Sequence, residues 1–270
     1  VVIGIVRDRA ARMLDCPQRF LNAIGSTFLK QHYATDGPLL AWLGHCFDCD
    51  AARWFARNTP GECVPYLRFL YDRPDEKVPD LWDNSPIEKI EHFESTGMVL
   101  ARSALTPEAA VLQYVCGPLE NDLYAAHPRT MGEIHTHLAK ANNAICFGMH
   151  GEALIDTSVM HYQIMTRDRN TTTVNGMGYT GEGAPWFVPR AASDERGVIE
   201  TCAVRSTADS PDGVLYVCGN TAALYKPELG VRKCRRRILS FLPHFFLLVD
   251  DLATTAEASL SAFFSSWPTA

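Results

Sequence analysis

The pattern of apolar positions changes once along the chain, from a helical period to a strand period. Up to about residue 72, large apolar side chains recur three and four positions apart, as they do between Phe20 and Leu29. This spacing predicts amphipathic helices. Turn-forming residues at 36–38 and 58–61 interrupt the pattern and predict helix ends. The many Trp and Phe residues of these helices favour a helical layer or toroid, and a small separate bundle is the alternative.

The segment 73–86 contains prolines among acidic residues and is the predicted linker. Beyond it the period becomes two, and short apolar runs alternate with turn signals, which is typical of an antiparallel sandwich. The predicted strands are 98–103, 110–115, 144–148, 152–156, 171–175, 198–204, 213–217, 236–241 and 245–250. We therefore expect an α+β multidomain chain, with helices and the linker in residues 1–85 and an antiparallel β-sandwich in residues 86–270.

Composition and charge exclude several classes of protein. The 270 residues are 47% hydrophobic, which is ample for a buried core. No apolar run approaches the ~20 residues that span a bilayer. The net charge is −6, which argues against a globally basic nucleic-acid binder. We expect no nucleic-acid partner and no membrane span, and a polyanionic partner has to meet a local basic patch.

Two features near the start of the chain bear on its processing and its redox chemistry. The run Val1–Arg9 is apolar with no basic segment before it, so it is more typical of a helix interior than of a signal peptide. We therefore expect a fragment or a processed chain. Cys46 and Cys49 have CxxC spacing, and the sequence contains no second such pair. A structural role and a metal or redox role both stay open for them.

The segment from Gly132 to His137 is the most informative for chemistry, because it places two imidazoles two residues apart. In an extended strand, His135 and His137 would point to opposite faces and would do different jobs. Imidazole is a proton carrier near neutral pH and a common metal ligand. A pair of loop or surface histidines without chemistry is the alternative interpretation.

From Phe93 onward, the order of motifs resembles the β-domain of the heparinase II/III-like family of polysaccharide lyases. The family's Gly-x-x-His-x-His segment is matched by Gly132–His137, and its His-Asn-Thr strand is matched in part by Arg169–Gly176. The other similar segments are 93–103, 151–156, 224–227, 236–241 and 246–250. The resemblance covers about two thirds of the chain. Each motif alone is loose, and their order and spacing make the resemblance specific.

The resemblance implies that the helices before residue 75 are the end of an α/α toroid. It also implies cleavage of a uronic-acid-containing acidic polysaccharide, of the alginate or glycosaminoglycan type, by β-elimination. In this reaction a base removes the C5 proton, the uronate carboxylate is neutralised, and an acid protonates the leaving oxygen at C4. By resemblance His135 is the catalytic residue, and the family's main base lies on the toroid upstream of Val1. A secreted or periplasmic location is expected.

The resemblance further implies one structural divalent metal (zinc, manganese or calcium), held in several family members at the positions of His137 and Asp156. Arg169 stands where the family has a histidine, and an arginine stays protonated and cannot ligate a metal. Either the metal site is lost or His161 supplies the third ligand. The acid that follows the family's His-x-His is also missing, and Lys140 in this region is a candidate contact for an anionic sugar.

Residues 231–237 form the densest basic run of this acidic chain. In a strand, Arg235 and Arg237 share one face and Arg236 lies on the other. A solvated strand edge, protected by its charge from aggregation, is one interpretation. A contact to a polyanionic chain is the other, with Arg235 and Arg237 as substrate-binding residues. Trp186, in a loop with Gly and Pro, either stacks on a sugar face or packs its own loop.

Three functions are compatible with these residues. The first is a polysaccharide lyase. The second is a uronate C5-epimerase of the same fold, which shares the proton abstraction but returns the proton to the other face of the sugar. The third is a non-catalytic carbohydrate-binding β-sandwich, which the missing histidine and acid favour and the retained Gly-x-x-His-x-His motif disfavours. The sequence leaves the oligomeric state open.

Overall fold

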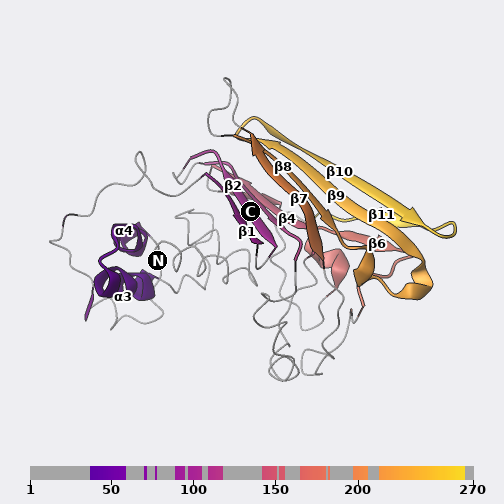
Figure 1. The fold of residues 1–270 in the computed structure, drawn as a ribbon, viewed down its shortest axis with the longest axis horizontal. Coiled ribbons are helices and arrows are strands. Elements are labelled where there is room, and N and C mark those ends of the chain that lie inside the picture. Colours follow the sequence, from indigo (N-terminus) through magenta and orange to yellow (C-terminus); the bar gives the residue numbers. More distant parts are fainter. Residues whose placement is uncertain are drawn as a thin grey trace. The chain divides into compact units, whose positions relative to one another are not determined.

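The structure is a computed structural model, and it describes only part of the chain. The described residues are 37–58, 70–71, 77, 89–94, 97–104, 109–117, 142–150, 152–155, 165–180, 182, 197–205 and 213–264. They contain the helices α3 and α4, the strands β1 to β11 and short 3₁₀ turns (Figure 1). In this part of the chain, no helix is long and apolar enough to cross a bilayer.

The helical pattern of the first region is realised in α3 (Gly37–Phe47) and α4 (Asp50–Asn58). Pro38 lies in the first turn of α3, where its missing N–H leaves no helical hydrogen bond unmade. The helices are joined through Asp48, whose left-handed backbone (φ 49°) ends α3. Arg53 of α4 binds the carboxylates of Asp48 and of Asp50, the first residue of α4. The predicted helix end near residue 58 is confirmed.

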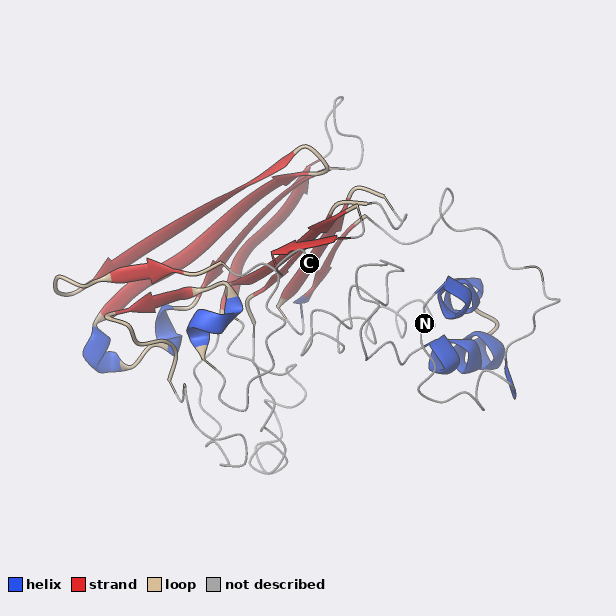
Figure 2. Cartoon of the chain, turned by 180° about the vertical axis from the view of Figure 1, so that it is seen from behind, coloured by secondary structure: helices blue, strands red, loops and turns tan. Residues whose placement is uncertain are grey.

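The strands form three antiparallel sheets. The first sheet, in the order β1-β2-β3-β4-β5, contains β1 (Ile90–Phe93), β2 (Met98–Arg102), β3 (Val111–Val115), β4 (Ala144–Met149) and β5 (Glu152–Ile155). The second sheet, in the order β10-β9-β8-β7, contains β7 (Val198–Arg205), β8 (Val214–Asn220), β9 (Val231–Phe241) and β10 (Phe245–Thr254). The third sheet pairs β11 (Leu260–Ala262) with β6 (Thr172–Val174). Figure 2 shows the long strands of the second sheet running side by side.

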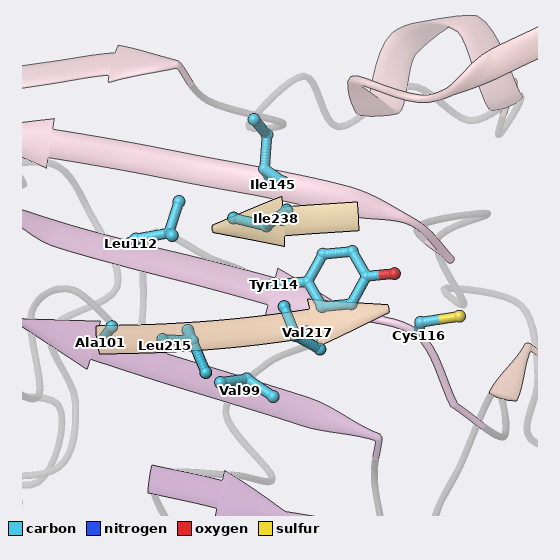
Figure 3. Close-up of a cluster of buried hydrophobic side chains, with 9 residues drawn as sticks. All are labelled: Val99, Ala101, Leu112, Tyr114, Cys116, Ile145, Leu215, Val217 and Ile238. Atoms are coloured by element: carbon cyan, nitrogen blue, oxygen red, sulfur yellow. The ribbon is translucent and has the colours of Figure 1, made fainter. Parts of the chain in front are cut away.

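The hydrophobic core lies between the first and second sheets (Figure 3). Its nine residues are no more than 2% exposed: Val99, Ala101, Leu112, Tyr114, Cys116, Ile145, Leu215, Val217 and Ile238. The first six come from the β2, β3 and β4 region, and the last three come from β8 and β9. Burying a large apolar side chain contributes about 2 kcal/mol, so these facing residues hold the two sheets together. The predicted antiparallel β-sandwich is confirmed for the described strands.

The basic run lies on β9, which is an interior strand. β9 pairs with β10 on one side and with β8 on the other. The interpretation of the run as a strand edge is therefore wrong, because edge position depends on partners that the local pattern does not reveal. The predicted alternation is confirmed: Arg236 is 1% exposed, whereas Arg235 and Arg237 lie on the outward face.

The chain divides into two compact units. α3 and α4 belong to one unit. The strands belong to the other, apart from residues 149–152 at the turn between β4 and β5.

Candidate functional site

Most of the predicted site residues lie outside the described residues. These are His135, His137, Lys140, Asp156, His161 and Trp186. They fall in three segments of the chain, 118–141, 156–164 and 183–196. The residues that flank these segments are described, and they contact one another.

The two ends of the segment 118–141 are joined by a hydrogen bond where β3 ends and β4 begins. Gly117 follows β3 and donates its backbone N–H to the side-chain oxygen of Asn142, which precedes β4, at 2.8 Å. Gly197 follows the segment 183–196, and a side-chain carbon at this glycine would lie only 2.1 Å from the same Asn142 oxygen. Gly197 therefore packs directly on Asn142, and only a glycine fits this approach.

Further hydrogen bonds link Asn142 to residues that flank the other two segments. The Asn142 carbonyl accepts the Tyr179 hydroxyl at 2.8 Å, and the Tyr179 N–H donates to the Thr166 hydroxyl at 2.8 Å. The Thr166 N–H donates to a Glu182 carboxylate oxygen at 3.0 Å. We call these six residues the anchor cluster: Gly117, Asn142, Thr166, Tyr179, Glu182 and Gly197. All three segments that hold the predicted site residues begin or end at this cluster or one residue from it.

Next to the anchor cluster, a buried arginine bridges the sheets. Arg236 of β9 donates from Nε and Nη2 to the two carboxylate oxygens of Asp250 on β10, both at 2.7 Å. Its Nη1 donates to the backbone carbonyl of Asn143 at 2.6 Å and to that of Asn170. Burial disfavours the guanidinium cation, but the hydrogen bonds and charge of Asp250 outweigh burial and raise the pKa of Arg236.

Asn143 is also held by its own side chain. Its Oδ1 accepts the Tyr114 hydroxyl at 2.5 Å, and its Nδ2 donates to the Thr221 hydroxyl at 3.0 Å. Burial raises the pKa of Tyr114 well above its usual range and raises that of the neighbouring Cys116 thiol to about 12. Both groups therefore stay protonated near neutral pH and act as buried hydrogen-bond donors, and neither is suited to be a general base.

Arg169 is 6% exposed and lies at the end of the 3₁₀ turn Thr166–Arg169, three residues before β6 begins at Thr172. This is the one described residue at the metal positions that the resemblance implies, and a guanidinium does not fit a metal site. Among the described residues, no group of three or more metal-ligating side chains is present. The predicted ligands His137, Asp156 and His161 lie outside the described residues, so the metal site stays a prediction.

The two predicted substrate-binding arginines are held by carboxylates on the outward face of the second sheet. Arg235 binds Glu200 through Nε at 2.6 Å, and Arg237 binds Asp251 at 3.0 Å. The hydrogen bond from Arg235 lowers the pKa of Glu200, and the hydrogen bonds from Lys233 and Arg237 lower that of Asp251. An anionic chain would have to compete with these carboxylates. The substrate-binding role of Arg235 and Arg237 stays a prediction.

Cys46 and Cys49 do not form a disulfide in the described helices. Cys46 is exposed, whereas Cys49 is 7% exposed. The two thiols therefore lie in different environments, and both roles considered for them stay predictions.

The bridge between Arg236, Asp250, Asn143 and Asn170 was not predicted from the sequence. One signal was available, since Asp250 is a carboxylate placed directly after the apolar run 245–249. A second was the position of Arg236 on the inward face of a predicted strand, where a cation needs a partner.

Comparisons with known proteins rest on the fold. No protein-family model matches the sequence, and no curated protein matches it. The heparan sulfate lyase HepC from Pedobacter heparinus matches with a TM-score of 0.54 and 13% identity, over 84% of this chain and 29% of that chain. A structure of heparinase III matches with a TM-score of 0.51 and 15% identity, over 81% of this chain and 28% of that chain.

A further heparinase III structure matches with a TM-score of 0.54 and 12% identity, over 85% of this chain and 29% of that chain. The chain thus spans less than a third of the length of these proteins. At such identities the likeness shows a shared fold. The resemblance to heparinase-type lyases that the motifs predicted is confirmed at that level.

Proposed function

We propose that this chain belongs to a polysaccharide lyase that cleaves a uronic-acid-containing acidic polysaccharide, of the alginate or glycosaminoglycan type, by β-elimination. The main support is the fold likeness to heparan sulfate lyase and heparinase III over more than four fifths of the chain. The Gly-x-x-His-x-His motif at Gly132–His137 adds to it. The residues 1–85 are proposed to be the end of an α/α toroid and its linker, and the protein to be secreted or periplasmic.

In the proposed reaction, a base takes the C5 proton, the electron pair forms the C4–C5 double bond, and the C4–O bond breaks. Negative charge builds on the uronate carboxylate in the transition state, and a nearby cation or hydrogen-bond donor lowers the barrier there. We assign this neutralising role, or one of the two proton transfers, to His135, since imidazole does either near neutral pH. Tyr114, Tyr179 and Tyr225 are buried structural donors and are not suited to be the partner base. By the resemblance, we assign that base to the toroid.

The anchor cluster supports a shared location for the predicted residues. The segments that contain His135, Asp156 and Trp186 all start or end at contacts around Asn142 and Thr166. A substrate that reaches one segment near its ends is therefore close to the others. Lys140 and Trp186 are proposed as contacts to the acid groups and to the sugar face, respectively. A divalent metal is proposed at His137, Asp156 and His161, with a structural role only.

The second candidate function is a non-catalytic carbohydrate-binding β-sandwich. The observation that favours it is Arg169, which is buried in its 3₁₀ turn at the position where the family has a metal-binding histidine. If the site has lost its metal, it has a structural reason to have lost its chemistry as well.

The test uses full-length protein with alginate, heparan sulfate and chondroitin sulfate chains. A lyase produces an unsaturated uronate, which is followed by its ultraviolet absorbance. An epimerase gives solvent deuterium at C5 without unsaturated product. Protein that gives neither signal, yet is retained on one of these polysaccharides, refutes both enzymatic proposals and leaves the binding module.

A further inference from the structure

We infer that Arg236, held by Asp250, is a positioning residue: its guanidinium fixes the two backbone turns at Asn143 and Asn170, beside the anchor cluster. The relevance of these turns to catalysis rests on the proposed function. The effect of Arg236 on the turns themselves does not.

The ion pair alone does not explain an arginine at this place. A buried ion pair costs several kcal/mol of desolvation per ion, and apolar replacements of such pairs are often neutral or stabilising. Arg236 is 1% exposed and lies in the sandwich interior, where the neighbouring inward positions of β9 hold Cys234 and Ile238. An apolar side chain would satisfy the packing. The reason for an arginine at this position therefore lies in the hydrogen bonds of Nη1, the donor that the ion pair does not use.

Those donors bind two carbonyls of the same unusual kind. Asn143 and Asn170 both have left-handed backbones, with φ of 60° and 53°. Asparagine tolerates this conformation better than most residues, but it persists only where the surroundings hold it. Nη1 of Arg236 donates to both carbonyls, because it carries two N–H groups and both oxygens lie within hydrogen-bond distance. The planar fork of arginine leaves Nε and Nη2 free for Asp250.

The two turns belong to different parts of the unit. Asn143 leads into β4 of the first sheet, and Asn170 leads into β6 of the third sheet. Phe264, after β11, places its ring 5.6 Å from the guanidinium carbon. One side chain of the second sheet therefore links all three sheets. Asn143 follows Asn142 of the anchor cluster, and Asn170 follows Arg169, so both turns sit one residue from positions that the proposed function uses.

Hydrogen–deuterium exchange of the 270-residue chain tests this. In the double variant Arg236→Met with Asp250→Leu, no charge is left unpaired. We expect peptides covering residues 142–145 and 169–172 to exchange about tenfold faster or more, as the loss of charge-assisted hydrogen bonds allows. Peptides from β8 should stay within about twofold of the wild type. The matched control, Arg235→Gln with Glu200→Gln, removes the neighbouring ion pair on the outward face and should leave both turns unchanged.

Equal acceleration throughout the unit, or none at the turns, overturns the inference, since the pair would then act on overall stability alone. If the double variant does not fold, Arg236→Lys decides. Lysine keeps the positive charge beside Asp250 but lacks the fork that reaches both carbonyls. Wild-type exchange at both turns in Arg236→Lys would overturn the inference. These exchange rates do not depend on lyase activity. A failure of the proposed function and a failure of this inference are therefore distinguishable.

Discussion

Arg236 and Asp250 face each other across the ladder of β9 and β10 and form a two-point ion pair, with both N···O distances at 2.7 Å. The arginine is almost fully buried, whereas the Asp250 side chain is 17% exposed. The carboxylate is therefore the partner that contacts solvent, and it supplies the negative charge that keeps the interior cation stable. The pair is thus strongly asymmetric, because removing the carboxylate leaves a buried charge behind.

The first prediction follows from this asymmetry. Asp250→Asn should lower the free energy of unfolding by about 3 kcal/mol, since it leaves the buried guanidinium without a counter-charge. Urea denaturation followed by circular dichroism measures it. Asp251→Asn, on the next residue of β10, is the matched control, because its pairs with Lys233 and Arg237 are on the outward face. Equal losses in the two variants would contradict the prediction.

The second prediction concerns alkaline pH. Burial raises the pKa of Cys116 to about 12, and it raises those of Tyr114, Tyr179 and Tyr225 above their usual value. The unfolded chain loses these protons at lower pH than the folded chain does. The stability that each group contributes is therefore complete below its unfolded-state pKa, which is about 9 for the thiol and about 10 for the tyrosines. Above that value, stability falls by about 1.4 kcal/mol per pH unit for each group that has passed it.

Urea denaturation at several pH values between about 8 and 10.5 measures this fall. Cys116→Ser should reduce the fall in the free energy of unfolding by about 1.4 kcal/mol per pH unit above the unfolded-state pKa of the thiol, because serine does not titrate in this range. Cys46→Ser, on an exposed thiol, is the control. An identical pH dependence in the wild type and in Cys116→Ser would show that the Cys116 thiol does not contribute.

The third prediction tests the outward arginines. If Arg235 binds an acidic polysaccharide, Glu200 competes for it, since Glu200 holds Arg235 at 2.6 Å. Glu200→Gln should then strengthen retention on immobilised heparin, and Arg235→Gln should weaken it. Elution by a salt gradient reports both changes. Lys226→Gln, at an exposed cation after β8, controls for net charge. If Arg235→Gln shifts elution no more than Lys226→Gln does, Arg235 is not a specific contact.

Local pattern was sufficient to predict the long strands. Alternation correctly placed Arg236 on the opposite face of β9 from Arg235 and Arg237, and the apolar run at Phe245–Val249 correctly marked β10. β11 was not predicted, because its three residues Leu260–Ala262 are all exposed and leave no buried face to read. The predicted strand began at residue 236, whereas β9 begins at Val231. The charged residues at its start do not alternate with apolar ones, so the strand pattern is not visible there.

The local pattern could not predict which residues contact one another. The acceptors of Arg236 lie 93 and 66 residues away in sequence, at Asn143 and Asn170. They meet the arginine only because the three sheets pack together. The interior position of β9 has the same origin, since it depends on which strands pair. Hence the sequence predicted which residues share a face of a strand, and the structure was needed to show which of them are buried and which residues they contact.

The fourth prediction concerns the metal. If His161 replaces the ligand lost at Arg169, then purified full-length protein holds about one equivalent of zinc, manganese or calcium, in the usual stoichiometry of a structural site. Elemental analysis measures the content before and after treatment with a chelator. His161→Ala should abolish it, whereas His150→Ala, at an exposed histidine, should not. Less than about a tenth of an equivalent would indicate that Arg169 marks a lost site.

The last prediction separates the two histidines of the motif. His135→Ala should lower the turnover of full-length protein on its best substrate by roughly a hundredfold or more, within the usual range for a general acid or base. Substrate affinity should change little, because the remote sugar contacts are kept. His137→Ala should instead lower thermal stability first, because a metal ligand acts through folding.

The measurements are the rate of appearance of unsaturated uronate and the melting temperature of each variant. The pH profile adds a further test, since a histidine that exchanges a proton gives a limb of the rate profile that His135→Ala removes, whereas a purely structural histidine leaves the profile in place. His135→Gln keeps a polar side chain of similar size but cannot titrate, so it should be as impaired as His135→Ala if proton transfer is the role. If either His135 variant retains the wild-type rate, the catalytic assignment fails, and the site must be sought on other residues near the anchor cluster.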